Sequence, residues 1–348
     1  MARKRVTPFT KSNLIKALKK GADILDLSEK FQKLPSTILK EIDELRKRYY
    51  NIKFESKDPD QLGIFKIQPQ ELPKGNLNID IDMNKLNADV IEFGVISDLH
   101  LNSKFERIDL ANAIYDVFAD NGIKTVYDQG NWIDGYAKRI NHGQVYQYTV
   151  DGQLDYAVAN YPQRKGIDTH FIGGDDHEGW FQKDTGLDVG RLFQQKAEDK
   201  GRTDLHYLGY MEADIYYETP LGAFHLRTLH GGGGSTYALS YYVQKLIESI
   251  EPAEKPHMML VGHLHKALFI PKYDGVAAIL SGCVQDQSNF MRKKKLKAMQ
   301  GAWMVKVILK ENGEPWQITP TFIDMTDLGL KPRRKYYIPD EVIKKRRF

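Results

Sequence analysis

The 348-residue sequence predicts an α/β chain in which a small helical domain precedes a larger, layered α/β domain. Three observations lead to this fold class. Apolar residues recur at helical spacing within residues 10–57. From Val90 onward, short apolar runs alternate with longer helical patterns. Between the two regions lies a stretch rich in Pro, Gly, Asn and Asp, which is typical of a linker.

Three helices are predicted at the start of the chain. Thr10 caps the first helix, and Gly21 ends it. A second short helix follows over residues 24–31, where apolar residues mark one face. After a turn, Ser36 or Thr37 opens a third helix.

Two strands, residues 50–54 and 63–67, follow the third helix. This order of elements resembles a winged helix-turn-helix domain, which we place at residues 1–68. In that fold the third helix enters the major groove of DNA and the strand hairpin contacts the backbone. The basic residues expected to contact phosphates here are Lys40, Arg46, Lys47, Arg48 and Lys53. The alternative is a module that binds a protein partner or forms a homo-oligomer.

Charge is distributed unevenly along the chain. The net charge is only +4, but residues 1–57 carry 15 Lys and Arg against 7 Asp and Glu. Residues 331–348 carry 8 basic and 2 acidic residues, so the middle of the chain is acidic. Basic ends favour a polyanionic partner such as DNA. Solvated surface charge is the alternative interpretation.

Composition excludes several classes of protein. The single cysteine, Cys283, excludes a disulfide scaffold and a cysteine-only metal cluster. No apolar run approaches the roughly 18 residues that span a bilayer. The N-terminus shows no secretory signal pattern. We therefore expect a cytoplasmic protein without a membrane partner.

Five predicted strands of the larger domain each end in polar residues. They lead into Asp98-Leu99-His100, Gly130-Asn131, Asp175-Asp176-His177-Glu178, His230 and Gly262-His263-Leu264-His265. Since catalytic groups of open α/β sheets gather at the carboxyl ends of strands, we expect these residues to meet. Their carboxylate, imidazole and amide groups together bind divalent cations. Side chains two residues apart lie on the same side of an extended segment. We therefore expect the Asp98/His100 pair to bind a metal from one side, and we expect the same of the His263/His265 pair.

The order of these motifs resembles the calcineurin-like metallophosphoesterase superfamily over residues 93–285. Residues 281–290 are similar to a stretch of the exonuclease subunit of archaeal replicative polymerases, in the DNA-repair nuclease branch. The resemblance implies a β-sandwich flanked by helices, which we place at residues 90–328, between a linker at 69–89 and a basic tail at 329–348. It also implies two divalent metal ions, with Mn²⁺ as first choice and Zn²⁺ or iron as alternatives.

The resemblance also implies a role for each motif residue. His177 is the implied catalytic residue, which faces the phosphate and assists the leaving group. The implied metal ligands are Asp98, His100 and His265 at a first metal and His230 and His263 at a second, with Asn131 and Asp176 completing the set. Asn131 stands where the superfamily has a bridging aspartate, and Asp176 where it has an asparagine. Because an amide bridges cations poorly, we expect Asp176 to carry more of the bridging charge, with help from Asp128 or Asp134.

The implied reaction is hydrolysis of a phosphoester by a metal-activated hydroxide. Three features favour DNA as the substrate: the N-terminal unit, the basic tail, and a basic run that includes Arg292, Lys293 and Lys294. We therefore predict a divalent-metal-dependent DNA nuclease or phosphodiesterase. The alternatives are a nucleotide or phosphoprotein phosphatase and a non-catalytic nucleic-acid-binding subunit with a degenerate site.

Residues 136–166 are predicted to form an insertion over the site. The segment contains Tyr146, Tyr148, Tyr156 and Tyr161, which could stack on exposed bases. Packing within the protein is the alternative role for these tyrosines.

Overall fold

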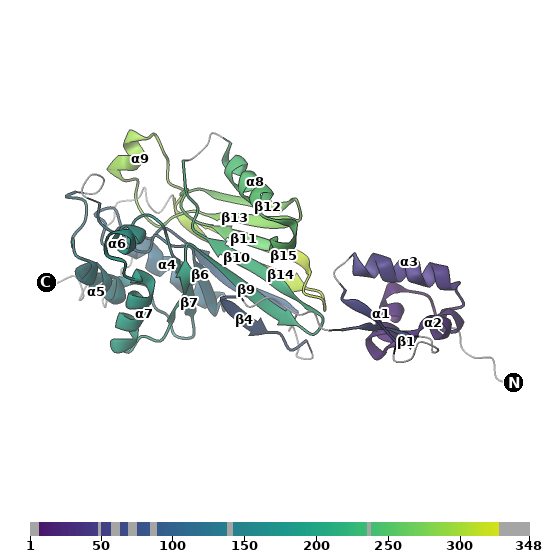
Figure 1. The fold of residues 1–348 in the computed structure, drawn as a ribbon. Coiled ribbons are helices and arrows are strands. Elements are labelled where there is room, and N and C mark those ends of the chain that lie inside the picture. Colours follow the sequence, from purple (N-terminus) through teal and green to yellow (C-terminus); the bar gives the residue numbers. More distant parts are fainter. Residues whose placement is uncertain are drawn as a thin grey trace.

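The computed structural model describes residues 7–47, 50–56, 63–68, 75–83, 89–137, 142–234 and 238–326. Figure 1 shows a small helical unit toward the N-terminus and a larger body of β-sheets with helices on their outer sides. The predicted α/β fold class is confirmed. The residue boundaries given above for the domains stay a prediction. No helix in the described ranges is both long and apolar enough to cross a membrane.

Three helices and a three-stranded antiparallel sheet form the N-terminal unit. Its elements are α1 (Lys11–Lys20), β1 (Ala22–Asp23), α2 (Ile24–Phe31), α3 (Pro35–Arg46), β2 (Ile52–Glu55) and β3 (Ile64–Ile67). As predicted, the Thr10 side chain caps α1 and Gly21 ends it. Pro35, rather than Ser36 or Thr37, opens α3. Proline suits the first helical position because it has no backbone N–H, and an N–H at that position would find no partner within the helix. Strand β1, which pairs with β3, is absent from the sequence-based prediction.

Two six-stranded sheets form the larger body. One has the strand order β15-β14-β5-β6-β7-β8, and the other has the order β12-β13-β11-β10-β9-β4. The strands are β4 (Leu77–Asp80), β5 (Val90–Ile96), β6 (Thr125–Asp128), β7 (Asp168–Gly173), β8 (Leu205–Tyr210), β9 (Glu212–Thr219), β10 (Gly222–Leu229), β11 (Met258–Val261), β12 (Ala267–Tyr273), β13 (Val276–Ser281), β14 (Gly301–Leu309) and β15 (Pro315–Asp324). The five strands predicted before the polar motifs are present as β5, β6, β7, β10 and β11.

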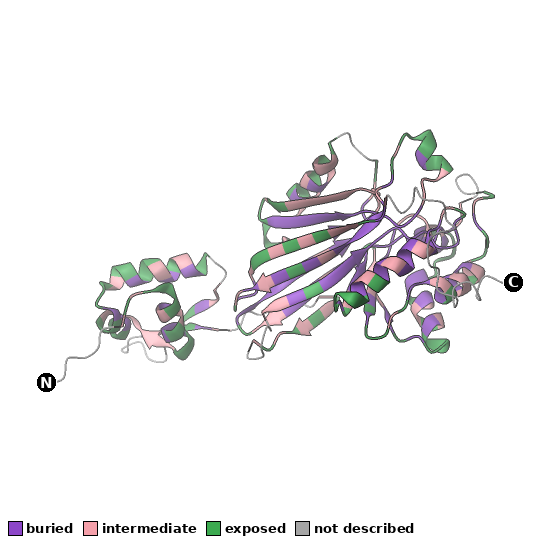
Figure 2. Ribbon diagram, turned by 180° about the vertical axis from the view of Figure 1, so that it is seen from behind, coloured by how far each residue is buried: buried purple, intermediate pink, exposed green. Residues whose placement is uncertain are grey.

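The two sheets pack face to face, with helices on both outer sides. Apolar residues of β5, β6 and β14 meet those of β9, β10, β11 and β13 in one buried cluster. The outer side of the first sheet is covered by α4 (Ile108–Asp120), α5 (Val150–Asn160), α6 (Glu178–Thr185) and α7 (Val189–Asp199). Helix α8 (Leu239–Ser249) covers the second sheet, a short 3₁₀ helix (Pro252–Glu254) precedes β11, and α9 (Asn289–Lys293) lies between β13 and β14. Figure 2 shows buried strands inside and exposed helix faces outside. The architecture is therefore a β-sandwich flanked by helices.

Parallel pairing brings the carboxyl ends of six strands to one edge of the sandwich. Strands β5, β6 and β7 are parallel neighbours in one sheet. Strands β10, β11 and β13 are parallel neighbours in the other. Because parallel strands end on the same side, the segments that follow them meet at this edge. All five polar motifs lie in these segments.

His257 ties the start of β11 to β10. Its Nδ1 accepts a hydrogen bond from the His225 amide at 2.9 Å, and its ring stacks on Phe224. Burial, together with the nearby His225, lowers the pKa of His257 to about 4. The unfolded chain keeps the ordinary pKa of about 6.5 and therefore binds more protons between pH 6.5 and pH 4. This difference destabilises the folded chain as the pH falls through that window.

We expect His257→Gln to reduce this acid sensitivity, because glutamine can still accept the amide hydrogen bond but takes up no proton. Between pH 7 and pH 4.5 the wild-type chain should lose about 1–3 kcal/mol more of its unfolding free energy than the variant. Urea unfolding at the two pH values measures this difference. Equal losses in the two chains would contradict the role of His257.

Candidate metal centre

Eight polar residues lie at the carboxyl edge of the sandwich: Asp98, His100, Asn131, Asp176, His177, His230, His263 and His265. They follow β5, β6 and β7 of one sheet and β10 and β11 of the other. Asp98, His100, Asn131 and His230 are buried. The sandwich therefore brings together residues that are up to 167 positions apart in the sequence.

Six of these residues adopt a backbone conformation that side-chain-bearing residues avoid. Their φ angles are positive: Asp98 54°, His100 46°, Asn131 54°, His177 52°, His263 79° and His265 53°. The left-handed region costs roughly 1–2 kcal/mol for a residue other than glycine. Such strain gathers at functional sites, where the surrounding structure maintains it. The concentration of strained backbone in these loops indicates that they form a functional site.

Buried apolar neighbours hold the loops in place. Leu99 and Leu101 alternate with the polar residues of the first motif and pack into the cluster beneath α4. Trp132 is fully buried after β6 and stacks on Phe193 of α7, with ring centroids 4.4 Å apart. These contacts direct the polar side chains between them away from the core and toward the shared edge.

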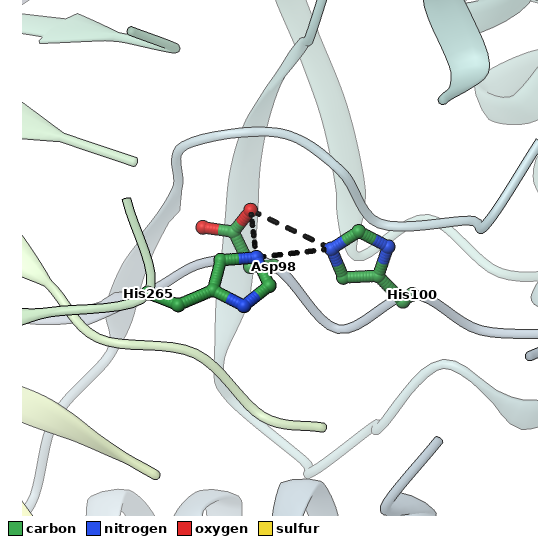
Figure 3. Close-up of side chains that lie close together, drawn as sticks. All are labelled: Asp98, His100 and His265. Carbon is green, nitrogen blue, oxygen red and sulfur yellow. Dashed lines mark hydrogen bonds and ion pairs between the residues drawn. The ribbon is translucent and has the colours of Figure 1, made fainter. Parts of the chain in front are cut away.

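Asp98, His100 and His265 form the first cluster, in which the carboxylate and both rings point toward one another (Figure 3). Oδ1 of Asp98 lies 3.2 Å from Nε2 of His265 and 3.6 Å from Nε2 of His100. The two Nε2 atoms are 3.3 Å apart. Two ligand atoms that bind one tetrahedral ion at about 2.1 Å lie about 3.4 Å from each other. The spacing of the three atoms therefore fits a single divalent ion.

Asp176, His230 and His263 form the second cluster. Oδ1 of Asp176 lies 3.3 Å from Nε2 of His230, and Oδ2 of Asp176 lies 3.5 Å from Nδ1 of His263. Asp176 Oδ1 and these two ring nitrogens are buried, and within the described residues they make no hydrogen bond. Buried polar atoms without partners are costly. A divalent cation bound between them would satisfy all three.

The two histidines of the last motif belong to different clusters. His265 faces Asp98 in the first cluster, and His263 faces Asp176 in the second. The expectation that both bind one metal from an extended segment is therefore wrong. The chain has already left β11 at these positions, and left-handed backbone at both residues turns the side chains apart. The Asp98/His100 pair does share one cluster, but its backbone is also left-handed rather than extended.

Backbone carbonyls determine which ring nitrogen faces the second cluster. His230 donates from Nδ1 to the Gln129 carbonyl at 2.6 Å, which leaves Nε2 as the free lone pair. His263 donates from Nε2 to the Gly233 carbonyl at 3.0 Å, which leaves Nδ1. In both rings the remaining nitrogen is the one beside Asp176. Such outer hydrogen bonds are typical of histidines that bind metals.

Asp134 connects the first cluster to His177. Its Oδ1 lies 3.1 Å from Nδ1 of His100 and 3.5 Å from Nδ1 of His177. Its backbone carbonyl accepts a hydrogen bond from Nδ1 of His177 at 2.8 Å. The other ring nitrogen of His177 lies 3.9 Å from Asp176. Sequence reasoning assigned Asp134 a share of the bridging charge and missed this orienting role, although its position three residues after Asn131 placed it near the site.

Charges within the centre shift one another's pKa values. Burial alone would raise the pKa of Asp98, but the neighbouring His265 and its hydrogen bonds hold it well below its usual range. Burial also opposes ionisation of Asp176, yet His177 and His230 lower its pKa. Burial opposes protonation of His230, and Asp176 outweighs it and raises the pKa to about 9. Both carboxylates are therefore ionised, as metal binding requires, whereas a metal ion would have to displace the proton that Asp176 holds on Nε2 of His230.

Asn131 lies beside Asp98 of the first cluster and near His230 of the second. Its Nδ2 donates to Asp98 at 3.2 Å, while its Oδ1 is buried with no hydrogen-bond partner among the described residues. A Cβ added to Gly174 would lie 2.6 Å from this Oδ1 and 3.0 Å from the His230 ring. The buried Glu178 accepts hydrogen bonds from the amides of Asn131 and Gly174 at 2.8 and 2.7 Å. Burial raises the pKa of Glu178 to about 7. Glu178 therefore ties the loop after β6 to the loop after β7.

Asp176 and Asp128 are the other carboxylates considered for bridging. Asp176 belongs to the second cluster. Asp128 accepts hydrogen bonds from the Tyr161 hydroxyl at 2.6 Å and the Gly130 amide at 3.0 Å. Asp176 therefore remains the carboxylate best placed to carry bridging charge, and this role stays a prediction.

We expect Asn131→Asp to tighten divalent-metal binding, because it places a carboxylate near both clusters. Calorimetric titration with Mn²⁺ should show an affinity about 10-fold higher or more, which corresponds to about 1.4 kcal/mol. Asn121→Asp adds the same charge beyond the far end of α4 and serves as the control. Unchanged affinity in Asn131→Asp, or an equal gain in both variants, would show that Asn131 does not lie at the metals.

The predicted DNA-contacting residues fall in two regions. Those within the described residues are Lys40, Arg46 and Lys47 at α3, Lys53 on β2, and Arg292, Lys293 and Lys294 at α9, and all are exposed. Arg46 lies over the ring of Phe65, and Lys47 pairs with Glu44, so these two cations already have partners within the unit. Arg48 and the basic tail lie outside the described residues.

No family model matches the sequence, and no curated protein matches it. Several solved structures align with about two thirds of the chain.

Three of these structures illustrate the likeness. A conserved uncharacterized protein of Streptococcus pneumoniae, described as a predicted phosphoesterase, is 11% identical with a TM-score of 0.30, over 67% of this chain and 98% of that chain. Wild-type Vps29 of Entamoeba histolytica, complexed with Zn²⁺, is 14% identical with a TM-score of 0.32, over 67% and 99%. A 5'-nucleotidase precursor of Thermus thermophilus is 10% identical with a TM-score of 0.34, over 68% and 54%.

Proposed function

We propose that the chain is a divalent-metal-dependent phosphoesterase that hydrolyses phosphodiester bonds in DNA. The observation that carries the proposal is the pair of Asp/His clusters at one edge, with His177 beside both. The His177 ring packs edge-on against His100 of the first cluster, with centroids 4.2 Å apart, and lies 3.9 Å from Asp176 of the second. Two charged clusters and a third imidazole at this spacing suit the binding and cleavage of a phosphoester.

Divalent ions held by the two clusters would neutralise phosphate charge and lower the pKa of a water molecule. Imidazole and carboxylate donors suit Mn²⁺, Zn²⁺ or iron, and Mn²⁺ is our first choice. His177 would act on the leaving oxygen. Burial and the neighbouring His100 lower its pKa, so a proton taken up at Nε2 is released readily. The Asp134 carbonyl holds Nδ1 throughout and keeps Nε2 toward the substrate.

DNA is favoured over a small phosphoester by the exposed cations beside the centre. The connection from β13 to β14 carries Arg292, Lys293 and Lys294. Its two ends are anchored to cluster residues, since the amide of Val284 donates to the Asp98 carbonyl at 3.1 Å and the amide of Met299 to the His265 carbonyl at 3.0 Å. A phosphate chain that reaches the metals would therefore pass these side chains.

The N-terminal unit supports the same substrate. We propose that it acts as a winged helix-turn-helix, with Lys40 of α3 and Lys53 of β2 available for phosphate contacts. The chain would then hold DNA through one unit and cleave it with the other. A partner protein bound through this unit is the competing role.

Cleavage of labelled single-stranded and duplex DNA with Mn²⁺, and with EDTA, tests the proposal. We expect cleavage with Mn²⁺ only, and faster hydrolysis of bis-p-nitrophenyl phosphate than of p-nitrophenyl phosphate. Preference for the monoester without DNA cleavage would favour a nucleotide or phosphoprotein phosphatase. DNA binding without hydrolysis of any ester would instead identify a non-catalytic binding subunit.

A further inference from the structure

A tyrosine-bearing segment, residues 142–148, runs along the loop that follows His100; we name it the tyrosine strap. Asn102, two residues after His100, bonds the strap through both its backbone and its buried side chain. Its carbonyl accepts from the Tyr146 amide at 3.0 Å, and its side chain exchanges two 2.9 Å hydrogen bonds with the Gln147 backbone. The Cα atoms of two residues paired by backbone hydrogen bonds lie about 5.5 Å apart, and two residues of chain span at most about 7 Å. The Cα atom of Tyr146 is therefore at most about 13 Å from that of His100.

The strap is also tied to the His177 side of the centre. The fully buried Gln153 donates from Nε2 to the carbonyls of both Gln147 and Gly135, each at 2.9 Å. Gly135 packs so closely against His177 that a Cβ added there would lie 2.0 Å from the His177 carbonyl oxygen. The strap is thus fixed relative to residues on two sides of the metal centre.

Two tyrosines of the strap expose their rings. Tyr146 is 50% exposed and Tyr148 is 46% exposed. Each is supported from within by another tyrosine: Tyr156 stacks on Tyr146 at 6.0 Å and 30°, and Tyr136 meets Tyr148 edge-on at 5.0 Å. Exposed aromatic rings that are held in place by neighbours offer flat apolar surfaces, and bases stack on such surfaces.

The connection from β13 to β14, which carries Arg292, Lys293 and Lys294, flanks the same loop. The amide of Asp286 donates to the Phe105 carbonyl at 2.8 Å, and Gln285 pairs with Glu106. Arg292 lies over the Phe105 ring, 6.0 Å from its centroid. The loop after His100 therefore has the tyrosine strap along residues 102–104 and Arg292 over residue 105. Stacking rings combined with backbone-binding cations are typical of sites for single-stranded nucleic acid.

We propose that Tyr146 and Tyr148 form a base-stacking subsite that directs the metal centre toward single-stranded DNA. Bases in a duplex are stacked and paired with one another, so only an unpaired strand can present their faces to the strap. The proposal rests on the phosphodiesterase function argued above and names the form of DNA that this centre takes.

The experiment measures binding of a fluorescent oligothymidine to the full chain in EDTA, at one fixed salt concentration, because such affinities depend on salt. We expect Tyr146→Leu and Tyr148→Leu each to weaken binding by about 5- to 100-fold, which corresponds to the loss of about one stacked base. Tyr146→Phe and Tyr148→Phe keep the rings and should stay within about 2-fold of wild type. Duplex binding should be unchanged in all four variants.

Trp316→Leu is the matched control. Trp316 is 73% exposed. Its neighbour Pro315 pairs with Leu309, which follows the residue paired with Val90 at the start of β5. Trp316 therefore lies at the edge of the sheet opposite the metal centre. We expect this variant to bind the strand like wild type. A second control is an oligomer that lacks bases. Wild type should bind this oligomer weakly, with about the affinity that the leucine variants have for the intact strand.

Three results would overturn the subsite: leucine variants that bind the intact strand like wild type, equal affinity of wild type for the strand without bases, or an equal loss in Trp316→Leu. Hydrolysis of bis-p-nitrophenyl phosphate by wild type tests the proposed function separately. If hydrolysis occurs and the leucine variants bind normally, the subsite is wrong and the function stands. If ring-dependent binding occurs without hydrolysis, the function is wrong and the strap still binds single strands.

Discussion

Asp98→Asn is expected to abolish metal binding at the first cluster and to lower phosphodiester hydrolysis by about 10³-fold or more. Oδ2 of Asp98 is held by the Ser97 hydroxyl at 2.6 Å and the His263 amide at 2.9 Å, so Oδ1 faces His100 and His265. Asparagine keeps this shape but removes the negative charge from a buried site. Metal ions contribute several kcal/mol of transition-state stabilisation, and each 1.4 kcal/mol is a factor of ten in rate.

The measurement combines calorimetric titration with Mn²⁺ and initial rates of DNA and bis-p-nitrophenyl phosphate hydrolysis. Asp116→Asn removes an exposed carboxylate from the far part of α4 and should leave both properties unchanged. A thermal melt in EDTA shows whether the variant is folded. A folded Asp98→Asn chain with wild-type affinity and rate would refute the first cluster as a metal site.

His177→Asn is expected to lower kcat by about 10²–10⁴-fold while leaving Mn²⁺ affinity within about 2-fold. The asparagine amide can still donate to the Asp134 carbonyl, which now accepts from Nδ1 at 2.8 Å. What is lost is Nε2, the nitrogen on the substrate side. Its loss affects proton delivery to the leaving oxygen more than metal binding.

The leaving group distinguishes this role from a positional one. Nitrophenolate leaves without a proton, whereas the sugar oxygen of DNA needs one, so the loss should be larger for DNA than for bis-p-nitrophenyl phosphate. His206→Asn on β8, which lies outside the centre, is the control. Equal losses for both substrates, or a large loss of Mn²⁺ affinity, would refute proton transfer by His177.

The secondary structure around the site was largely predictable from local patterns. The mostly apolar run at residues 93–97 predicts a strand because a strand buried on both faces needs apolar residues on both. The polar residues directly after this run could therefore be placed at a strand end. Thr10 and Gly21 marked the ends of α1 because capping depends on adjacent residues alone. The short strand β1 was missed because a two-residue strand has no periodicity of its own.

The separation of His263 from His265 could not be predicted from their spacing. A two-residue interval places side chains on one side only if the backbone is extended, and here both residues have positive φ. The role of Asp134 was equally hidden, because it depends on contacts with His100 and with His177, 43 residues further along the chain. The same holds for the strap, whose position depends on hydrogen bonds from Asn102 and Gln153.

The sequence alone determined the types of ligand, their order along the chain and their places at the ends of strands, because strand and helix patterns are set by neighbouring residues. The family resemblance already implied how these ligands divide between two metals. Only the tertiary structure decided how the backbone turns His263 and His265 apart, which nitrogen of each histidine faces the clusters, and which loop the tyrosines accompany. Those properties depend on the pairing of β5, β6 and β7 in one sheet and of β10, β11 and β13 in the other. Contacts across two packed sheets join residues distant in sequence, and no local pattern encodes them.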